Sequence, residues 1–285
     1  MVVLVTGANG QLGQAIQHIA KSYLNLNFVF CNSTDLDISN KENCQAVFHK
    51  IKPDFCINAA AYTAVDKAES EQDKAELINV IGAKNLAETC NEFDTKLIHI
   101  STDFVFDGSN DKPYSETDIP NPKGVYGQTK LDGEKVIQAV FSKYYIIRTS
   151  WVYSQFGNNF MKTMLRLASE RTSLSVVNDQ MGTPTNAVDL AEALVQIILN
   201  NNQQPTANHF GTYHFSNEGQ CSWYDFAKKI FEINNVSIDL SAIPTEQFPT
   251  PAQRPKYSVL DKSKIKSTFG LPIKTWEESL KSIKI

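Results

Sequence analysis

A tyrosine and a lysine stand four positions apart, at Tyr126 and Lys130, in a segment whose apolar residues recur at helical spacing. Residues four apart share one face of a helix, so the phenol and the ammonium are predicted to face one cleft. A free phenol titrates near pH ~10, and a nearby cation lowers that pKa. Such a tyrosine can give a proton to a carbonyl oxygen near neutral pH. The alternative is a surface pair without function, and the rest of the chain must decide between them.

A glycine turn near the start of the chain predicts a dinucleotide site. Val2–Val5 has the apolar pattern of a buried strand, and Gln14–Ala20 has that of a helix. Between them, Gly7 suits a tight turn, Gly10 lets the backbone approach a pyrophosphate, and Gly13 lets the helix pack closely on the strand. The helix N-terminus would then offer free N–H groups to the phosphates. The alternative is a plain glycine turn.

The end of the second predicted strand, Asn27–Phe30, carries neither an acid for the ribose hydroxyl nor an arginine for a 2′-phosphate. The sequence therefore leaves NADH and NADPH both open. Asp37 and Ile38 follow, where a carboxylate could approach an adenine amino group. The alternative for Asp35 or Asp37 is capping of the next helix.

Polar and small residues follow two further predicted strands. Residues 55–57 run into a stretch of small residues, and residues 96–100 run into Ser101-Thr102-Asp103. Ligands of open α/β sheets bind at the carboxyl ends of the strands, so Thr102 is a candidate site hydroxyl. Strand-end turn chemistry and simple packing are the alternatives. His99 is interpreted as a core histidine.

Composition narrows the class of protein. The chain has 285 residues, of which 42% are apolar and 20% charged, and its net charge is −4. No basic stripe points to nucleic acid or to an anionic membrane surface as a partner. The five cysteines are scattered and odd in number, which suits reduced thiols in the cytoplasm. No apolar run reaches the ~20 residues that span a bilayer, so a cytoplasmic location is expected.

The alternation of strands and helices predicts an α/β protein with a doubly wound parallel sheet and a smaller mixed C-terminal domain. We expect residues 1–150 to form the dinucleotide-binding domain, rejoined by about residues 171–200. Residues 151–170 and 206–285 are expected to form the substrate-binding domain. In the latter, Arg254 stands before a proline and could clamp a diphosphate, unless it is a surface arginine in a rigid turn.

The motifs together are similar to those of the extended short-chain dehydrogenase/reductase superfamily. They occur in its order: the glycine turn, Asn58-Ala59-Ala60, Ser101-Thr102-Asp103 and Tyr126-x-x-x-Lys130. More narrowly, the chain resembles the dTDP-4-dehydrorhamnose reductase family. That resemblance covers nearly the whole chain and includes residues 58–69, 101–106, 125–130, 148–153, 157–160, 179–185 and 249–255.

The resemblance implies roles for individual residues. It makes Tyr126 the proton donor, Lys130 the group that binds the nicotinamide ribose and lowers the phenol pKa, and Thr102 the hydroxyl beside the substrate carbonyl. Cofactor contacts are expected from Gly7, Gly10, Gln11, Leu12, Gly13, Asp37, Ile38, Ala59, Ala60, Ala61, Tyr62, Thr63, Tyr126 and Lys130. Substrate contacts are expected from Thr102, Asp103, Trp151, Asn159 and Arg254.

The activity that the resemblance implies is NADPH- or NADH-dependent reduction of the 4-keto group of dTDP-4-dehydro-L-rhamnose. The alternatives are another dTDP-4-keto-6-deoxyhexose reductase, an epimerase, or a non-catalytic subunit like the regulatory subunit of methionine adenosyltransferase. Gln14-Ala15 replaces an acid with which some relatives bridge a dimer through magnesium. We therefore expect no metal at the site, no magnesium-bridged dimer, and a monomer or weak homodimer whose partner is a dTDP-deoxysugar.

Overall fold

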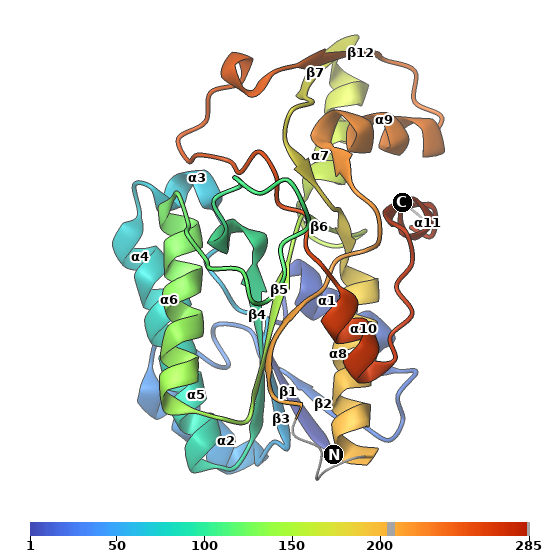
Figure 1. Cartoon of the computed structure of the whole chain (residues 1–285). Helices are drawn as coiled ribbons and strands as arrows, with labels where there is room; N and C mark the ends of the chain where they lie inside the picture. The colour runs from blue at the N-terminus through green and yellow to red at the C-terminus, as the bar shows by residue number, and fades with distance from the viewer. Residues whose placement is uncertain (204–208, 284–285) are drawn as a thin grey trace.

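A six-stranded parallel sheet forms the centre of the molecule (Figure 1). The structure is a computed structural model, and it describes residues 1–203 and 209–283. The strand order is β10-β5-β4-β3-β1-β2, so the chain reverses its direction of winding between β1 and β3. The strands are β1 (Val2–Thr6), β2 (Asn27–Phe30), β3 (Phe55–Asn58), β4 (Lys96–Thr102), β5 (Tyr144–Thr149) and β10 (Gly211–His214). The predicted doubly wound fold is confirmed.

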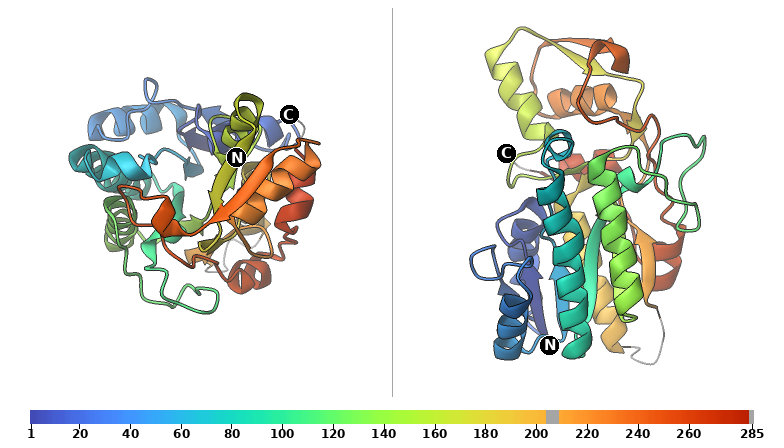
Figure 2. Two further views of the ribbon diagram at one scale, coloured as in Figure 1. Left: turned by 90° about the horizontal axis from the view of Figure 1, so that it is seen from above. Right: turned by 90° about the vertical axis from the view of Figure 1, so that its left-hand side faces the viewer.

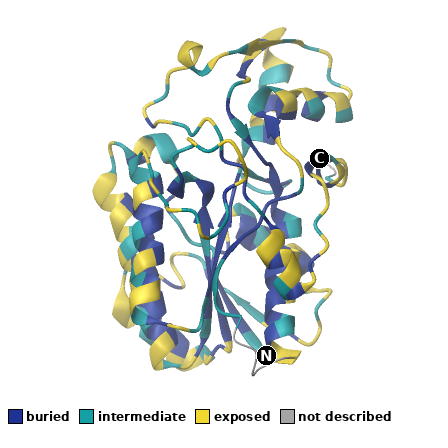
Figure 3. Cartoon of the chain, viewed as in Figure 1, coloured by how far each residue is buried: buried dark blue, intermediate teal, exposed yellow. Residues whose placement is uncertain are grey.

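Helices cover both faces of this sheet, which explains why its strands are continuous apolar runs. Val3, Leu4 and Val5 of β1 are fully buried, and Figure 3 shows the same burial along the inner strands. One face carries α1 (Gln11–Ala20), α8 (Ala187–Gln203) and α10 (Ser263–Phe269). The other carries α2 (Lys41–Ile51), α5 (Gly82–Glu92) and α6 (Val125–Val140).

The helical segment that follows α3 (Val65–Ala68) contains a wider turn. It begins as α4 (Gln72–Glu76), passes through a π-helical turn over Leu77–Ile81, and continues as α5. Such turns often mark functional sites. Here the turn carries Asn79, whose side-chain amide donates to the Tyr62 carbonyl at 3.1 Å and to the Thr129 hydroxyl at 3.1 Å. Asn79 therefore ties the segment after β3 to α6.

A smaller α/β domain lies over the carboxyl edge of the sheet (Figure 2). Its core packs two helices against a parallel strand pair. The C-terminal helix α11 packs into the same core, and short strand pairs connect the domain to the sheet. The elements are β6 (Val152–Tyr153), α7 (Phe160–Glu170), β7 (Ser173–Val177), β8 (Met181–Gly182), β9 (Thr185–Asn186), β11 (Cys221–Ser222), α9 (Trp223–Ile233), β12 (Asp239–Ile243) and α11 (Trp276–Lys281).

The chain crosses between the two domains more often than the sequence predicts. Residues 173–177, placed in the first domain, form β7 and pair with β12 in the smaller one. Residues 211–214, placed in the second domain, form β10 and pair with β5 of the central sheet. The reason is burial, since this pairing covers Tyr213, which is 3% exposed. Residues 206–208, also placed in the second domain, lie outside the described residues.

The described residues also bear on disulfides, membrane spans and metal sites. All five cysteines are free and buried. Within residues 1–203 and 209–283, no helix has the length and apolar character to cross a membrane. Over the same ranges, no three His, Cys, Asp or Glu side chains gather as a metal site would require.

Candidate active site

The glycine turn lies at the carboxyl end of β1, beside the point where the sheet reverses its winding. Gly7 has a φ of +65°, and a Cβ there would come within 2.7 Å of the Ala60 nitrogen. A Cβ on Gly13 would lie 2.4 Å from the Gly7 carbonyl oxygen, so only glycine allows this approach of helix to strand. Helix α1 begins at Gln11, and its N-cap Gly10 makes no side-chain capping hydrogen bond. Within the residues that the structure describes, no hydrogen bond from the N–H groups of Gln11, Leu12 or Gly13 is found, so these groups can bind phosphate oxygens.

A cleft of about 760 Å³ opens from this turn along the carboxyl edge of the sheet. It brings together residues that are far apart in the sequence and that come from both domains. Among the residues predicted for cofactor, substrate and catalysis, those that line it are Gly10, Gln11, Leu12, Ala59, Ala61, Thr63, Thr102, Asp103, Tyr126, Lys130, Trp151, Asn159 and Arg254.

Six predicted cofactor contacts do not line this cleft. Gly7 and Gly13 shape the turn itself, and the other four are Asp37, Ile38, Ala60 and Tyr62. The exposed Asp37 accepts from the Ser39 nitrogen at 2.9 Å and closes a local turn, while Asn40 is the N-cap of α2. Ile38 is 5% exposed and belongs to the core beneath α5. The Tyr62 hydroxyl donates to Glu71, and the Ala60 nitrogen donates to the side chains of Thr6 and Asn58 at the ends of β1 and β3. The predicted roles of these four residues gain no support from the geometry.

Thr102 is the last residue of β4 and Tyr126 lies in the first turn of α6, and both line the cleft. The Thr102 hydroxyl donates to Asp103 Oδ1 at 3.0 Å and accepts from the Phe104 nitrogen at 3.2 Å. The Tyr126 ring is partly buried and packs edge-on against Phe104, with ring centroids 5.6 Å apart. Burial raises the pKa of Tyr126 to about 12, although the hydroxyl of Thr102 acts in the opposite direction. The expected lowering of the phenol pKa is therefore not found.

Lys130 explains that difference, because its amine is turned toward β4. The side chain is 2% exposed, and Nζ donates to the Ile100 carbonyl at 2.6 Å. The His99 Nε2 atom lies 3.3 Å from the same nitrogen. Burial lowers the pKa of Lys130 to about 8, and the neighbouring Glu134 only partly offsets this. Tyr126 and Lys130 thus share one cleft, as predicted, but burial is the main influence on the pKa of each.

Asp103 adds a buried acceptor beside Thr102. It is 1% exposed, and burial raises its pKa to about 6 against the effect of hydrogen bonds from Ser258 and Thr102. Within the described part of the chain, Asp103 Oδ2 is a buried atom that has no hydrogen-bond partner. A buried acceptor left over in a ligand-sized cleft is suited to bind a hydroxyl group of a substrate.

Two tryptophans form the wall that the smaller domain contributes. Trp151 and Trp223 stack at a centroid distance of 3.5 Å, and a Cβ on Gly182 would come within 2.5 Å of the Trp151 ring. Trp151 has a φ of +47°, a left-handed conformation that bulky residues rarely adopt. Sequence reasoning missed Trp223 because its place at the start of an amphipathic helix indicated only core packing. No local signal in the sequence distinguishes it.

Asn159 joins the two halves of the cleft. Its side-chain oxygen Oδ1 accepts from the Lys162 backbone nitrogen at 3.1 Å, and this hydrogen bond caps α7. Its amide nitrogen donates to Gln11 Oε1 at 3.0 Å. The start of α7 is thereby fixed to the start of α1, so this hydrogen bond joins the smaller domain to the glycine turn.

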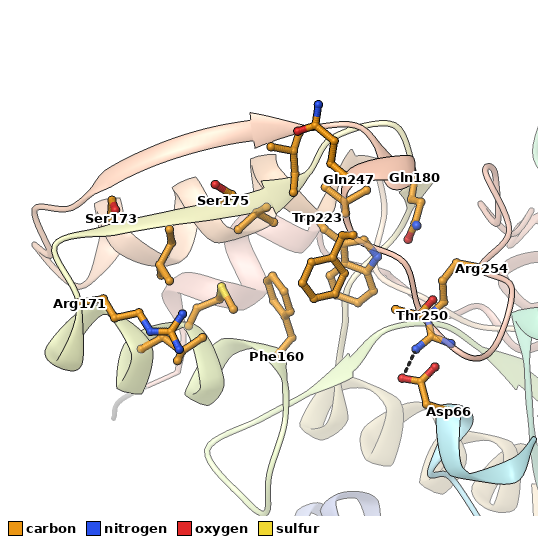
Figure 4. Close-up of a pocket in the computed structure, with 17 residues that line it drawn as sticks. Asp66, Phe160, Arg171, Ser173, Ser175, Gln180, Trp223, Gln247, Thr250 and Arg254 are labelled. Carbon is orange, nitrogen blue, oxygen red and sulfur yellow. Dashed lines mark hydrogen bonds and ion pairs between the residues drawn. The ribbon is translucent and has the colours of Figure 1, made fainter. Parts of the chain in front are cut away.

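Arg254 lies where this cleft meets a second pocket of about 700 Å³ in the smaller domain (Figure 4). Its Nη2 donates to Asp66 Oδ2 at 2.7 Å, across the domain boundary. Trp223 and Arg254 line both pockets, so the two form one continuous groove. The apolar lining of the second pocket comes from α7, α9 and the β7–β12 pair, and includes Phe160, Met164, Leu167, Leu174, Val176, Val177 and Ile243.

A doubly wound parallel sheet with a glycine turn at its reversal point, and a Thr–Tyr–Lys set at its carboxyl edge, defines an extended short-chain dehydrogenase/reductase. The family model described as RmlD substrate binding domain matches residues 1–284. The dTDP-4-dehydrorhamnose reductases of Aggregatibacter actinomycetemcomitans and Escherichia coli K12 are 42% and 43% identical to the chain over 289 residues. Both matches cover 99% of this chain and at least 96% of the relative. The chain belongs to the dTDP-4-dehydrorhamnose reductase family.

Solved structures agree with this assignment. The dTDP-4-dehydrorhamnose reductase of Clostridium acetobutylicum superposes with a TM-score of 0.94 at 45% identity, covering 99% of this chain and 98% of that one. The Bacillus anthracis enzyme, solved in complex with NADP, gives a TM-score of 0.93 at 41% identity with the same coverage. A Thermus thermophilus UDP-glucose 4-epimerase shares the fold at 18% identity.

Proposed function

We propose that the protein reduces the 4-keto group of dTDP-4-dehydro-L-rhamnose with NADPH or NADH and so forms dTDP-L-rhamnose. The observation that carries this proposal is the convergence of Thr102, Tyr126 and Lys130 in one cleft with the free N-terminus of α1. The relatives that match the whole chain are named for the same reaction. The direct test is substrate-dependent loss of NADPH absorbance, which must not occur without the sugar nucleotide.

The residues at the glycine turn fit a dinucleotide. Side chains at Gly7 and Gly13 would collide with backbone, so the turn keeps its backbone exposed. The N–H groups at the start of α1 would bind the pyrophosphate, and Ala59, Ala61 and Thr63 would line the adjoining wall. Bound in this way, the nicotinamide supplies a hydride to C4 of the sugar.

The reduction leaves negative charge on the 4-oxygen, which Tyr126 neutralises by donating its phenolic proton. Thr102 positions the carbonyl by a hydrogen bond from its hydroxyl. Lys130 binds the ribose of the cofactor and, in its charged form, favours the phenolate that Tyr126 becomes. Asp103 Oδ2 accepts a hydrogen bond from a sugar hydroxyl. These roles require only groups that already line the cleft.

The sugar nucleotide extends from the cleft into the second pocket. Arg254 sits at the junction and binds the diphosphate, since a guanidinium matches the geometry of two phosphate oxygens. The apolar pocket beyond it takes the nucleoside, with Trp223 and Phe160 as its aromatic surfaces. Asp66 pairs with Arg254 and holds the guanidinium at the junction.

We expect NADPH and NADH to support turnover with kcat/KM values within about tenfold, or ~1.4 kcal/mol, of each other. The reason is that β2 ends at Phe30 and is followed by Asn32 and Thr34, which bond to each other at 2.6 Å. The strand itself ends without an acid and no arginine follows it, while the nearby Asp35 accepts from the Asn32 nitrogen at 3.0 Å. Steady-state kinetics with each cofactor measures the ratio, and a preference above about a thousandfold in either direction would refute the expectation.

Replacing Arg254 by alanine should weaken binding of dTDP by about 1.5–3 kcal/mol, the range for hydrogen bonds to charged groups. Binding of NADPH should barely change, because the glycine turn lies at the other end of the cleft. Calorimetry with each ligand measures both effects. Arg166→Ala is the matched control, since this exposed arginine pairs with Glu170, its neighbour one turn along α7. Equal loss of NADPH and dTDP binding would argue against a diphosphate role.

A further inference from the structure

A buried row of polar side chains runs beneath Lys130. Thr6, Asn58 and His99 are register partners on the neighbouring strands β1, β3 and β4. The Thr6 hydroxyl donates to Asn58 Oδ1 at 2.7 Å, and the Asn58 amide nitrogen lies 3.0 Å from His99 Nδ1. His99 Nε2 then lies 3.3 Å from Lys130 Nζ. All four side chains are at most 2% exposed, so each hydrogen-bonding group must find its partner within the row.

The row fixes which nitrogen of His99 carries a proton. Asn58 Oδ1 accepts from the Thr6 hydroxyl and also from the Ala60 backbone N–H at 3.2 Å, and these two donors set the orientation of the amide. Its NH₂ group therefore donates to His99 Nδ1. Burial alone lowers the pKa of His99, and a charged Lys130 beside it lowers that pKa further, so the ring is neutral whichever form Lys130 takes. A neutral imidazole that accepts at Nδ1 carries its hydrogen on Nε2.

The hydrogen on His99 Nε2 faces the Nζ atom of Lys130. A lysine ammonium offers only donors, whereas the free amine has a lone pair that accepts. The contact with His99 Nε2–H thus favours the uncharged amine, while the Ile100 carbonyl accepts one of the hydrogens of that amine. Of the other ionisable groups near the cleft, Glu134 favours the ammonium but is itself paired with Arg148 at 2.6 Å. Tyr126 and Asp103 line the same cleft.

We propose that His99 is a positioning residue for the proton of Lys130. Asn58 fixes the His99 tautomer, and the Nε2–H of that tautomer holds Lys130 as an amine that gains and loses its proton close to neutral pH. The proposal rests on the proposed function for its catalytic meaning, because only a charged Lys130 favours the Tyr126 phenolate. His99 would then set the pH above which this support for Tyr126 is lost.

The first experiment is NMR on cofactor-free protein labelled with ¹⁵N and ¹³C at histidine and lysine. The expected result for the unmodified chain is the Nε2–H tautomer of His99 and a Lys130 titration midpoint at about pH 8. The Lys130 signal is identified by its loss in Lys130→Met. A His99 ring with its hydrogen on Nδ1 would overturn the proposal, and this reading needs no variant that might misfold.

Two variants then separate the proton effect from simple burial. His99→Met keeps the site filled but removes the N–H, so the Lys130 midpoint should rise by about one pH unit. Asn58→Asp can only accept, so it should move the His99 hydrogen to Nδ1 and let Nε2 accept from the ammonium. His49→Met, on the exposed side of α2, is the control and should leave both signals in place. An unchanged Lys130 midpoint in folded His99→Met would refute the proposal.

Turnover gives a separate reading. The alkaline limb of the kcat–pH profile should move to higher pH in His99→Met, because Lys130 keeps its charge further into the alkaline range. A fixed limb together with a shifted NMR titration would show that the proton of Lys130 does not govern catalysis, which contradicts the proposal. If the protein reduced no sugar nucleotide, the proposed function would fail while the tautomer and the titration could still be measured.

Discussion

Replacing Tyr126 by phenylalanine is expected to lower kcat by ~10²–10⁴-fold, the usual worth of general acid catalysis. The change keeps the ring, and with it the edge-on packing against Phe104, so the fold should persist. Only the proton that neutralises the new alkoxide is lost. Single-turnover measurement with excess enzyme isolates the chemical step, and fluorescence titration with NADPH should show nearly unchanged cofactor binding.

The control for this variant is Tyr144→Phe, since Tyr144 lies at the first residue of β5, at the opposite end of the sheet. It removes the same atom from a site that takes no part in the reaction and should leave kcat within experimental error. If Tyr126→Phe keeps more than a third of the original single-turnover rate, Tyr126 is not the proton donor.

Lys130→Met should produce a different pattern, in which kcat falls and cofactor binding weakens together. The side chain is buried between α6 and β4, and methionine fills most of its volume. What is lost is a hydrogen-bonding group for the ribose and the charge that favours phenolate. A loss of about 1.5–3 kcal/mol in NADPH binding corresponds to a hydrogen bond with a charged group.

Lys135→Met serves as the control, because this exposed lysine is on the same helix and pairs with Asp132. Calorimetry with NADPH and single-turnover kinetics compare the two variants. A drop in kcat without any change in NADPH affinity would show that Lys130 does not bind the ribose. Its role would then be limited to favouring the Tyr126 phenolate.

The parts of the site that depend on local chemistry could be predicted from the sequence. Gly7 and Gly13 were identifiable because only glycine tolerates the backbone approach at those positions. Thr102 was identifiable because it ends a buried strand, and parallel strands present their carboxyl ends at one edge. Tyr126 and Lys130 were identifiable from their helical spacing, and both line the cleft.

Features that depend on long-range packing could not be predicted in the same way. The stacking of Trp223 on Trp151 joins residues that lie far apart in the chain, and nothing in the local pattern of α9 indicates it. The return of β10 to the central sheet is decided by pairing with β5. The pKa values of Lys130 and Tyr126 are decided mainly by burial, so spacing alone gave the wrong direction for the pKa of Tyr126.

The most direct test of the proposed reaction is NMR of the product formed from dTDP-4-dehydro-L-rhamnose and NADPH that carries deuterium at the transferred position. We predict dTDP-L-rhamnose with the deuterium at C4 of the sugar and one equivalent of NADP⁺ formed. Recovery of a 4-epimer would point to a different deoxysugar reductase. Firm binding of the cofactor with no reduction of any dTDP-4-keto sugar would contradict the account and favour a non-catalytic role.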